Sequence, residues 1–492
     1  MSSLRGSSIP LFKIKVAAKG QIKDIKEIVV RVSGLPSCMN GQIIDMGNGV
    51  RGIVMGYDER NVLVLLLGDA GGLRLGGEVE GIDEPFRIPV GQGLIGRMIN
   101  ALGEPCDQAG EVAAEVHLPV FRDSPPITWR EPVSESLPTG TRAVDCVVPV
   151  AKGQRQLIIG DRMTGKTVIA LDAILNQRGR DMVCVYCCLG KSVSALEKVM
   201  ATLRDKGALE YTVIVVATDS SPTGEQYLVP FSAVSTAEFF ASKGRDVLVV
   251  FDDLTKHAWA YRQLSLLLDR PPGREAYPGD IFYVQTQLME RAGKFNASHG
   301  GGSITFLGIA ETLQGDLTGY IPSNLASMCD GQVYMSSSLF AEGFRPAVDF
   351  TLSISIIGGR VQPLILRQLG SRLRVDFAKY TEIVQLSKMQ SGVSGEAEKI
   401  LKKGQAIMSV LQQPQNRPAS IAEQVVYLYA LRKAVLEDMS RGDKEKFVEE
   451  IWPFAQKHDS TLMARIEQTL ELLPDIERGL DELMAAYMAQ AQ

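Results

Sequence analysis

An eight-residue glycine-bearing loop is the feature that most constrains the fold of this chain. Residues Gly160 to Thr167 read GDRMTGKT, which fits the pattern of a glycine, four residues, a glycine, a lysine and a serine or threonine. The apolar run RQLIIG precedes the loop, and the helix-like run KTVIALDAIL overlaps its end and continues beyond it. This order predicts a strand, a loop whose backbone N–H groups converge on phosphates, and a helix whose positive N-terminal end faces them.

The loop predicts a binding site for ATP or ADP together with Mg²⁺. We expect Lys166 to reach the terminal phosphates and the Thr167 hydroxyl to bind the metal. Five apolar residues run into Asp252, whose carboxylate would lie at the end of a strand and orient Mg²⁺ and its waters. The alternative is a chance match in a glycine-rich chain, and the flanking strand and helix argue against it. The nucleotide-binding residues predicted from the loop are Gly160, Asp161, Arg162, Met163, Thr164, Gly165, Lys166 and Thr167.

The chain shows three successive sequence patterns, and its 492 residues are enough for roughly three domains. Residues 1–86 hold short strand-like runs between Gly, Asn and Asp turns, which predicts a small antiparallel β-barrel. Residues 87–365 alternate buried-strand runs with helix-length segments, which predicts a central α/β P-loop domain of the RecA-like kind. In residues 366–492 apolar residues recur at helical spacing, and Ser420 with Glu423 forms a capping-box pattern, so we expect an α-helical bundle.

The charge balance and the lengths of the apolar runs limit the possible partners. The chain has 52 Lys and Arg against 57 Asp and Glu, a net charge of -5, so no global basic surplus favours nucleic acid. Its longest apolar runs are far shorter than the ~18 residues that suggest a membrane span. We therefore expect no nucleic-acid partner and no segment that crosses a membrane.

Three long segments resemble the alpha subunits of F-type ATP synthases. They read TGTRAVDCVVPVAKGQRQLIIGDRMTGKT, DDLTKHAWAYRQLSLLLDRPPGREAYPGD and ETLQGDLTGYIPSNLASMCDGQVY, and the likeness extends over nearly the whole chain. PAVDFTLSIS, residues 346–355, is similar to a signature that alpha and beta subunits of this family share. The resemblance implies the same three-domain order as the patterns above.

The resemblance also implies a function. It is that of a nucleotide-binding alpha-type subunit in the head of a rotary, ion-translocating ATP synthase or ATPase, which makes ATP from ADP and phosphate with an ion gradient, or runs in reverse. The implied partners are beta-type catalytic subunits in an alternating ring, the gamma central stalk, a peripheral stalk and a membrane rotor. The implied location is peripheral, at the cytoplasmic face of a bacterial inner membrane.

One loop within the resemblance argues against catalysis by this chain itself. Attack on the terminal phosphate needs a carboxylate that orients or deprotonates water. The family's beta subunits keep a glutamate in the loop after the second core strand and typical alpha subunits have a glutamine there, whereas this chain has Lys191. A lysine is cationic at neutral pH and cannot serve as that base unless it is strongly desolvated. Even a Lys191 that points to solvent would leave the carboxylate missing, so we expect binding without cleavage.

Three further residues are assigned to the nucleotide site by the resemblance alone. Arg345 stands where alpha subunits have an arginine near the nucleotide. Gln413 and Gln415 stand where two glutamines lie against adenine.

The end of the shared signature departs from the family. Typical alpha subunits have there an arginine that reaches into the neighbouring beta site, but this chain has Ile356. The next arginine, Arg360, would lie ~13 Å further along an extended strand, which is too far for a direct substitute. Gly358 and Gly359 could turn the chain back, but we expect a real loss of the arginine finger.

The N-terminus is a second departure, because only nineteen residues precede Gly20, among them Gly6 and Pro10. The helix with which the family's alpha subunits dock the peripheral stalk is therefore expected to be shortened or lost, as in a divergent second copy of the synthase. Two other functions stay open, a self-sufficient homohexameric P-loop ATPase and a paralogue kept for regulation or assembly. The sequence leaves open whether H⁺ or Na⁺ is translocated.

Overall fold

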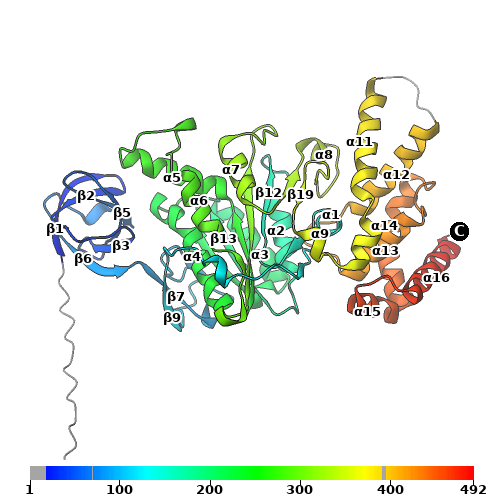
Figure 1. The fold of residues 1–492 in the computed structure, drawn as a ribbon, viewed down its shortest axis with the longest axis horizontal. Helices are drawn as coiled ribbons and strands as arrows, with labels where there is room; N and C mark the ends of the chain where they lie inside the picture. Colours follow the sequence, from blue (N-terminus) through cyan, green and yellow to red (C-terminus); the bar gives the residue numbers. More distant parts are fainter. Residues whose placement is uncertain (1–17, 69, 390–394, 492) are drawn as a thin grey trace, which may run out of the picture.

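The structure, a computed structural model, describes residues 18–68, 70–389 and 395–491. Its three parts follow one another along the long axis of the molecule, from a barrel through a sheet domain to a group of helices (Figure 1). The order agrees with the predicted order of domains. The expected loss of the N-terminal docking helix concerns residues 1–17, which lie outside the described residues.

The first part is a closed antiparallel barrel with the strand order β1-β2-β5-β4-β3-β6. Alternate residues such as Val30, Val32 and Val64 point inward and are fully buried. Closure leaves no unpaired edge strand, which suits a small sheet with a single apolar face. The strands are β1 (Ala18–Lys26), β2 (Val29–Ser33), β3 (Gln42–Asp45), β4 (Arg51–Tyr57), β5 (Val62–Leu67) and β6 (Glu78–Pro85).

The second part is built on a nine-stranded, mostly parallel sheet of order β19-β18-β12-β17-β15-β13-β14-β8, with β16 paired to β17. The strand that leads into the glycine loop, β12, is central, with parallel neighbours on both sides. The strands are β8 (Met98–Asn100), β12 (Arg155–Gly160), β13 (Met182–Leu189), β14 (Thr212–Ala217), β15 (Asp246–Asp252), β16 (Gly293–Lys294), β17 (Ser303–Glu311), β18 (Gly331–Met335) and β19 (Ile354–Ser355). Two small pairs lie apart from it, β7 (Arg87–Val90) with β9 (Val116–Pro119) and β10 (Ser136–Leu137) with β11 (Val150–Ala151).

Helices cover both faces of this sheet. Leu157 and Ile159 of β12 pack into one apolar core, whereas Ile158 between them packs into the other. The first core takes in α4 (Thr223–Ser242), α5 (Leu254–Leu267), α6 (Ile281–Met289) and α7 (Tyr320–Met328), and the second takes in α1 (Arg142–Val147), α2 (Lys166–Leu175) and α3 (Val193–Asp205). Burial on both faces explains why the strands read as continuous apolar runs in the sequence. The short helices α8 (Ser337–Ala341) and α9 (Gly358–Val361) follow β18 and β19.

The third part is helical, as predicted. Ser420 is the N-cap of α13, where its Oγ accepts a hydrogen bond from the N–H of Glu423 at 3.1 Å. The helices share one continuous apolar core with α1, α2 and α3, so the helical part is anchored to the sheet domain. They are α10 (Leu364–Gly370), α11 (Leu373–Met389), α12 (Gly395–Leu411), α13 (Ile421–Arg432), α14 (Arg441–His458), α15 (Ser460–Thr469) and α16 (Pro474–Ala491).

The predicted boundaries after residues 86 and 365 stay predictions. The barrel strands end at Pro85, and α10 begins at Leu364. Among the helices of the described ranges, none combines the length and the apolar character that crossing a membrane requires.

Candidate functional site

The glycine loop joins the end of β12 to the start of α2, as the sequence predicts. Gly165 is the N-cap of α2 and has a φ of 96°, in the left-handed region that glycine adopts without strain. The Lys166 ammonium donates hydrogen bonds to the carbonyl oxygens of Gly160 at 2.9 Å and Asp161 at 2.6 Å. Burial lowers the pKa of Lys166, and nearby carboxylates oppose that effect. The loop thus holds a buried cation at the positive end of a helix, which is an anion-binding arrangement.

Two side chains of the loop, Asp161 and Thr164, form hydrogen bonds within the protein. Asp161 Oδ1 accepts hydrogen bonds from the Thr312 hydroxyl at 2.6 Å and from the N–H of Gly315 at 2.7 Å. The Thr164 hydroxyl donates to the carbonyl oxygen of Asp161 at 2.8 Å. Met163, by contrast, is 90% exposed. The phosphate contacts predicted for these residues stay predictions, and for Asp161 a backbone contact fits better because its carboxylate is already engaged.

A pocket beside the loop brings together residues that are far apart in the sequence. It contains the loop residues Thr164 and Gly165 and also the three residues that the resemblance assigned to the nucleotide, Arg345, Gln413 and Gln415. The other lining residues are Thr141, Val168, Ile169, Asp172, Met335, Phe340, Pro346, Ala347 and Pro414. Its lining is of the apolar kind that suits a base and ribose, but the cavity measures only about 30 Å³, so the lining must move apart before a nucleotide enters.

Two buried oxygen atoms of this pocket are suited to a ligand. Thr141 Oγ1 and Asp172 Oδ1 are buried without a hydrogen-bond partner among the described residues. Burial raises the pKa of Asp172 to about 7, although the N–H of Asn416 opposes the rise. The sequence analysis missed Asp172, which stands alone in the apolar run of α2, and that isolation is the signal that could have found it. A ribose hydroxyl or the amino group of a base would satisfy these atoms.

The polar atoms of the Gln413 amide are bonded to the backbone, and the predicted contact of this side chain with adenine stays a prediction. Its Oε1 accepts from the N–H of Arg142 at 2.9 Å, and its Nε2 donates to the carbonyl oxygens of Gly140 at 2.8 Å and Arg417 at 2.7 Å. The side chain therefore borders the pocket with its carbon atoms while its polar atoms hold the backbone. Gln415 is exposed at the pocket. The Arg345 guanidinium stacks over the ring of Phe340, with 4.8 Å to the centroid.

The two residues predicted to bind Mg²⁺ lie close together, but a lysine connects them. Lys191 Nζ donates to Thr167 Oγ1 at 2.8 Å and forms an ion pair with Asp252 Oδ2 at 2.6 Å. The Tyr186 hydroxyl donates to the same carboxylate oxygen at 2.9 Å. The alternative in which the Lys191 side chain points to solvent is therefore wrong.

This donor set does not fit Mg²⁺. The metal binds oxygen atoms at about 2.0–2.1 Å in a near-octahedral shell, and both oxygens that it would use already hold the ammonium group.

The other carboxylates near the loop are engaged as well. Asp253 caps α5 by accepting a hydrogen bond from the N–H of Thr255 at 2.6 Å. Burial, and next the charge of Glu311, raise the pKa of Asp253 to about 7. Glu311 forms an ion pair with Arg162 at 3.4 Å. Neither carboxylate is placed as a free base beside the phosphates.

The segment after Ile356 differs from the extended strand assumed above. Ile356 is 71% exposed at the edge of the sheet, directly after β19. The chain then turns into α9, which contains Arg360. The residues from Gly358 onward are helical and therefore not extended, so the strand-based estimate of ~13 Å between Ile356 and Arg360 does not apply.

The role suggested for the two glycines of this segment also needs correction. Gly358 is required for a close approach, since a Cβ atom there would lie 1.7 Å from the carbonyl oxygen of Pro149. Neither Gly358 nor Gly359 has a positive φ. The turn therefore does not depend on dihedrals that only glycine tolerates.

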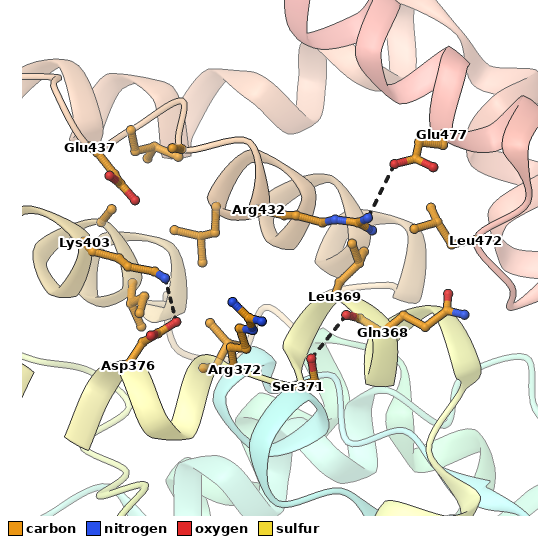
Figure 2. A pocket seen from close by; sticks show the side chains of 16 residues that line it. Gln368, Leu369, Ser371, Arg372, Asp376, Lys403, Arg432, Glu437, Leu472 and Glu477 are labelled. Carbon is orange, nitrogen blue, oxygen red and sulfur yellow. Dashed lines mark hydrogen bonds and ion pairs between the residues drawn. The ribbon is translucent and has the colours of Figure 1, made fainter. Parts of the chain in front are cut away.

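A larger cavity, of about 660 Å³, lies in the helical part between α10, α11, α12 and α13 (Figure 2). Lys403 pairs with Asp376 at 2.8 Å across it, and Arg432 pairs with Glu477 at 3.6 Å. Two of the three cations in its lining are paired with carboxylates, the lining holds as many carboxylates as cations, and none of its residues belongs to the glycine loop. Its charges therefore do not favour a polyphosphate.

The sheet, the glycine loop and the adjoining pocket define a P-loop nucleotide-binding protein. Comparison with known families agrees: residues 140–355 match the nucleotide-binding domain of the ATP synthase alpha/beta family, and residues 362–487 match the C-terminal domain of the ATP synthase alpha/beta chain. The chain is 40% identical over 484 residues to ATP synthase subunit alpha of Clostridium acetobutylicum, covering 98% of this chain and 96% of that protein. It is also 40% identical over 475 residues to ATP synthase subunit alpha of Clostridium botulinum strain Eklund 17B, covering 96% and 94%. The chain therefore belongs to the ATP synthase alpha/beta family, among its alpha-type subunits.

Proposed function

We propose that this chain binds ATP or ADP without hydrolysing it, as the alpha-type subunit in the head of a rotary, ion-translocating ATP synthase. The observation that carries the proposal is the position of Lys191. The lysine stands where catalysis would need a carboxylate, and it contacts Thr167 and Asp252 beside the glycine loop. A carboxylate base is missing there, and the carboxylates nearby have other partners.

The proposed partners follow from the family. Beta-type subunits would alternate with this chain in a ring and carry the catalytic sites, with a gamma stalk at the centre, a peripheral stalk and a membrane rotor. The exposed Ile356 at the edge of the sheet supports a neighbouring subunit on that side. The complex would lie at the cytoplasmic face of a bacterial membrane. Mg²⁺ is not part of this proposal, because both of its expected ligands bind Lys191.

The two alternative functions are not favoured. A self-sufficient homohexameric ATPase needs a catalytic carboxylate of its own, and the relatives reported above are alpha subunits. A paralogue kept only for regulation or assembly would not need the pocket beside the loop, with its unpartnered polar atoms.

Co-expression with a beta-type subunit tests the proposal. We expect the two chains to be recovered in equal numbers, nucleotide to be bound to this chain, and hydrolysis to require the beta-type chain. A homohexamer of this chain with steady ATPase activity would overturn the proposal. A chain that forms no complex with any beta-type subunit would support the regulatory alternative instead.

A further inference from the structure

We propose that the Lys191 ammonium replaces Mg²⁺ in this chain, so that the site binds ATP or ADP as the metal-free polyphosphate. The proposal rests on the nucleotide binding proposed above and specifies the form of the ligand. It is carried by one cluster: Lys191 Nζ bridges Thr167 Oγ1, at 2.8 Å, and Asp252 Oδ2, at 2.6 Å. These two oxygens are the ones that the sequence assigns to the metal.

The folded backbone fixes the position of this ammonium group. β13 and β15 are neighbouring parallel strands, and Cys188 on the first is in register with Asp252 on the second. Lys191 follows three residues after Cys188, in the loop before α3, so its side chain starts beside the carboxylate. Asp252 is 1% exposed and also accepts a hydrogen bond from the Tyr186 hydroxyl, so it cannot turn away to solvent. The lysine side chain itself is 20% exposed.

The ammonium can do for the phosphates part of what the metal would do. It has three N–H donors, and two of them are directed to Thr167 and Asp252. The third N–H group can donate a hydrogen bond to a phosphate oxygen, and charge-assisted hydrogen bonds of this kind are among the stronger ones. Lys191 adds a second ammonium donor beside Lys166, next to the N–H groups of the loop and the positive end of α2, while Asp252 balances its charge.

A divalent cation has no equivalent set of ligands here. The charge of Asp252 is already balanced by Lys191, and the nearby carboxylates of Asp253 and Glu311 are engaged with α5 and with Arg162. Mg²⁺ would need oxygens at about 2.0–2.1 Å and would meet the ammonium within the same cluster. The lysine therefore selects against the metal as well as replacing it.

The replacement would also account for the absence of turnover that is proposed above. In phosphoryl transfer, Mg²⁺ bridges phosphate oxygens and neutralises the charge that develops on them. A single ammonium cannot coordinate two phosphate groups with the fixed geometry of the metal. One residue thus removes both the base and the metal from the site.

The test is equilibrium binding of radiolabelled ATP and ADP to the purified full-length chain, measured once with excess EDTA and once with excess Mg²⁺. We expect the wild-type Kd to agree within about threefold between the two conditions. Lys191→Gln should bind at least about tenfold more weakly in EDTA, with Mg²⁺ restoring its affinity. The matched control is Lys198→Gln, an exposed lysine of α3, which should behave as wild type.

A second measurement detects the metal directly. Mn²⁺ titrated against the chain with ATP, and followed by electron paramagnetic resonance, should bind no more tightly than it binds ATP alone. Lys191→Gln with ATP should gain one tight Mn²⁺ ion.

The outcomes separate the two proposals. Wild-type binding that Mg²⁺ strengthens tenfold or more, or a tight Mn²⁺ ion in the wild-type chain, would mean that the metal displaces Lys191, and the present inference would be wrong. If the wild-type chain bound no nucleotide either in EDTA or in Mg²⁺, both proposals would be wrong.

Discussion

Lys191 Nζ lies 2.6 Å from Asp252 Oδ2, and this ion pair joins the loop after β13 to the end of β15 beneath the glycine loop. The pair sits where a catalytic P-loop ATPase would hold its metal and, close by, its carboxylate base. Its consequence is a site that keeps the features for holding a nucleotide and lacks those for cleaving it.

Lys166→Ala should abolish tight nucleotide binding to the full chain, with at least a hundredfold increase in Kd for ATP. A buried polyphosphate would lose the point charge nearest the loop, and Lys191 alone cannot compensate for it. Fluorescence or calorimetric titration measures the effect, and Lys198→Ala on the exposed face of α3 serves as the control. Affinity equal to that of the wild type would show that the loop is not the nucleotide site.

Ile356→Arg should raise ATP hydrolysis by the assembled complex at least tenfold. An arginine supplied from a neighbouring chain is typically worth about 1,000- to 100,000-fold in phosphoryl transfer, and isoleucine supplies none of it. Arg360→Ala is the informative companion, since α9 brings this residue nearer to Ile356 than a strand would. We expect it to change the rate less than twofold. Loss of a fast wild-type activity in Arg360→Ala would identify Arg360 as the finger and contradict the predicted loss.

Gly358→Ala should destabilise the chain by at least about 2 kcal/mol, because the added Cβ would lie 1.7 Å from the Pro149 carbonyl oxygen and must push backbone aside. The neighbouring residue is a matched control: a Cβ at Gly359 meets nothing within 4 Å. Thermal and urea unfolding of the two variants should therefore differ clearly. Equal midpoints would mean that α9 does not pack on Pro149 in this way.

Asp172→Asn should flatten the dependence of stability on pH between about 4 and 7. The pKa of Asp172 is raised from 3.8 to about 7 in the folded chain, so over that range the folded state carries a proton that the unfolded state has released. The contribution of Asp172 to the free energy of unfolding is therefore fully present below pH 4 and is lost as the pH rises through 7. The asparagine variant should accordingly melt above the wild type at pH 8. The exposed Asp205→Asn should leave the pH profile unchanged, and an identical profile in Asp172→Asn would contradict the raised pKa.

The parts of the site that the sequence predicts well are those built from local order. A strand, a glycine loop and a helix follow one another directly, so the position of Lys166 could be inferred from spacing alone. Thr167 and Asp252 could be paired because the carboxyl ends of parallel strands meet at one edge of a sheet. The capping pattern at Ser420 likewise depends only on residues within one turn of helix.

The parts that the sequence does not predict depend on contacts between distant residues. The Gln413 amide forms hydrogen bonds with the backbone of Gly140 and Arg142, about 270 residues away, and no local sequence pattern predicts these bonds. Helix α9 is four residues long, too short to show a period, and it is held by the close approach of Gly358 to Pro149. Lys191 could be recognised as a missing carboxylate, but the register of β13 and β15 was needed to bring its side chain to Asp252.

The central claim is that this chain holds a nucleotide and does not cleave it, and a single-turnover experiment tests that claim most directly. The full chain, in excess over ATP labelled at the γ-phosphate, is incubated without any beta-type subunit and quenched at intervals, in parallel with Lys191→Glu. The account predicts bound, intact ATP with no release of labelled phosphate above the rate in buffer, and the same result for Lys191→Glu, since a base without the rest of the constellation contributes little. Stoichiometric conversion of the bound ATP to ADP and phosphate by the wild-type chain would contradict it.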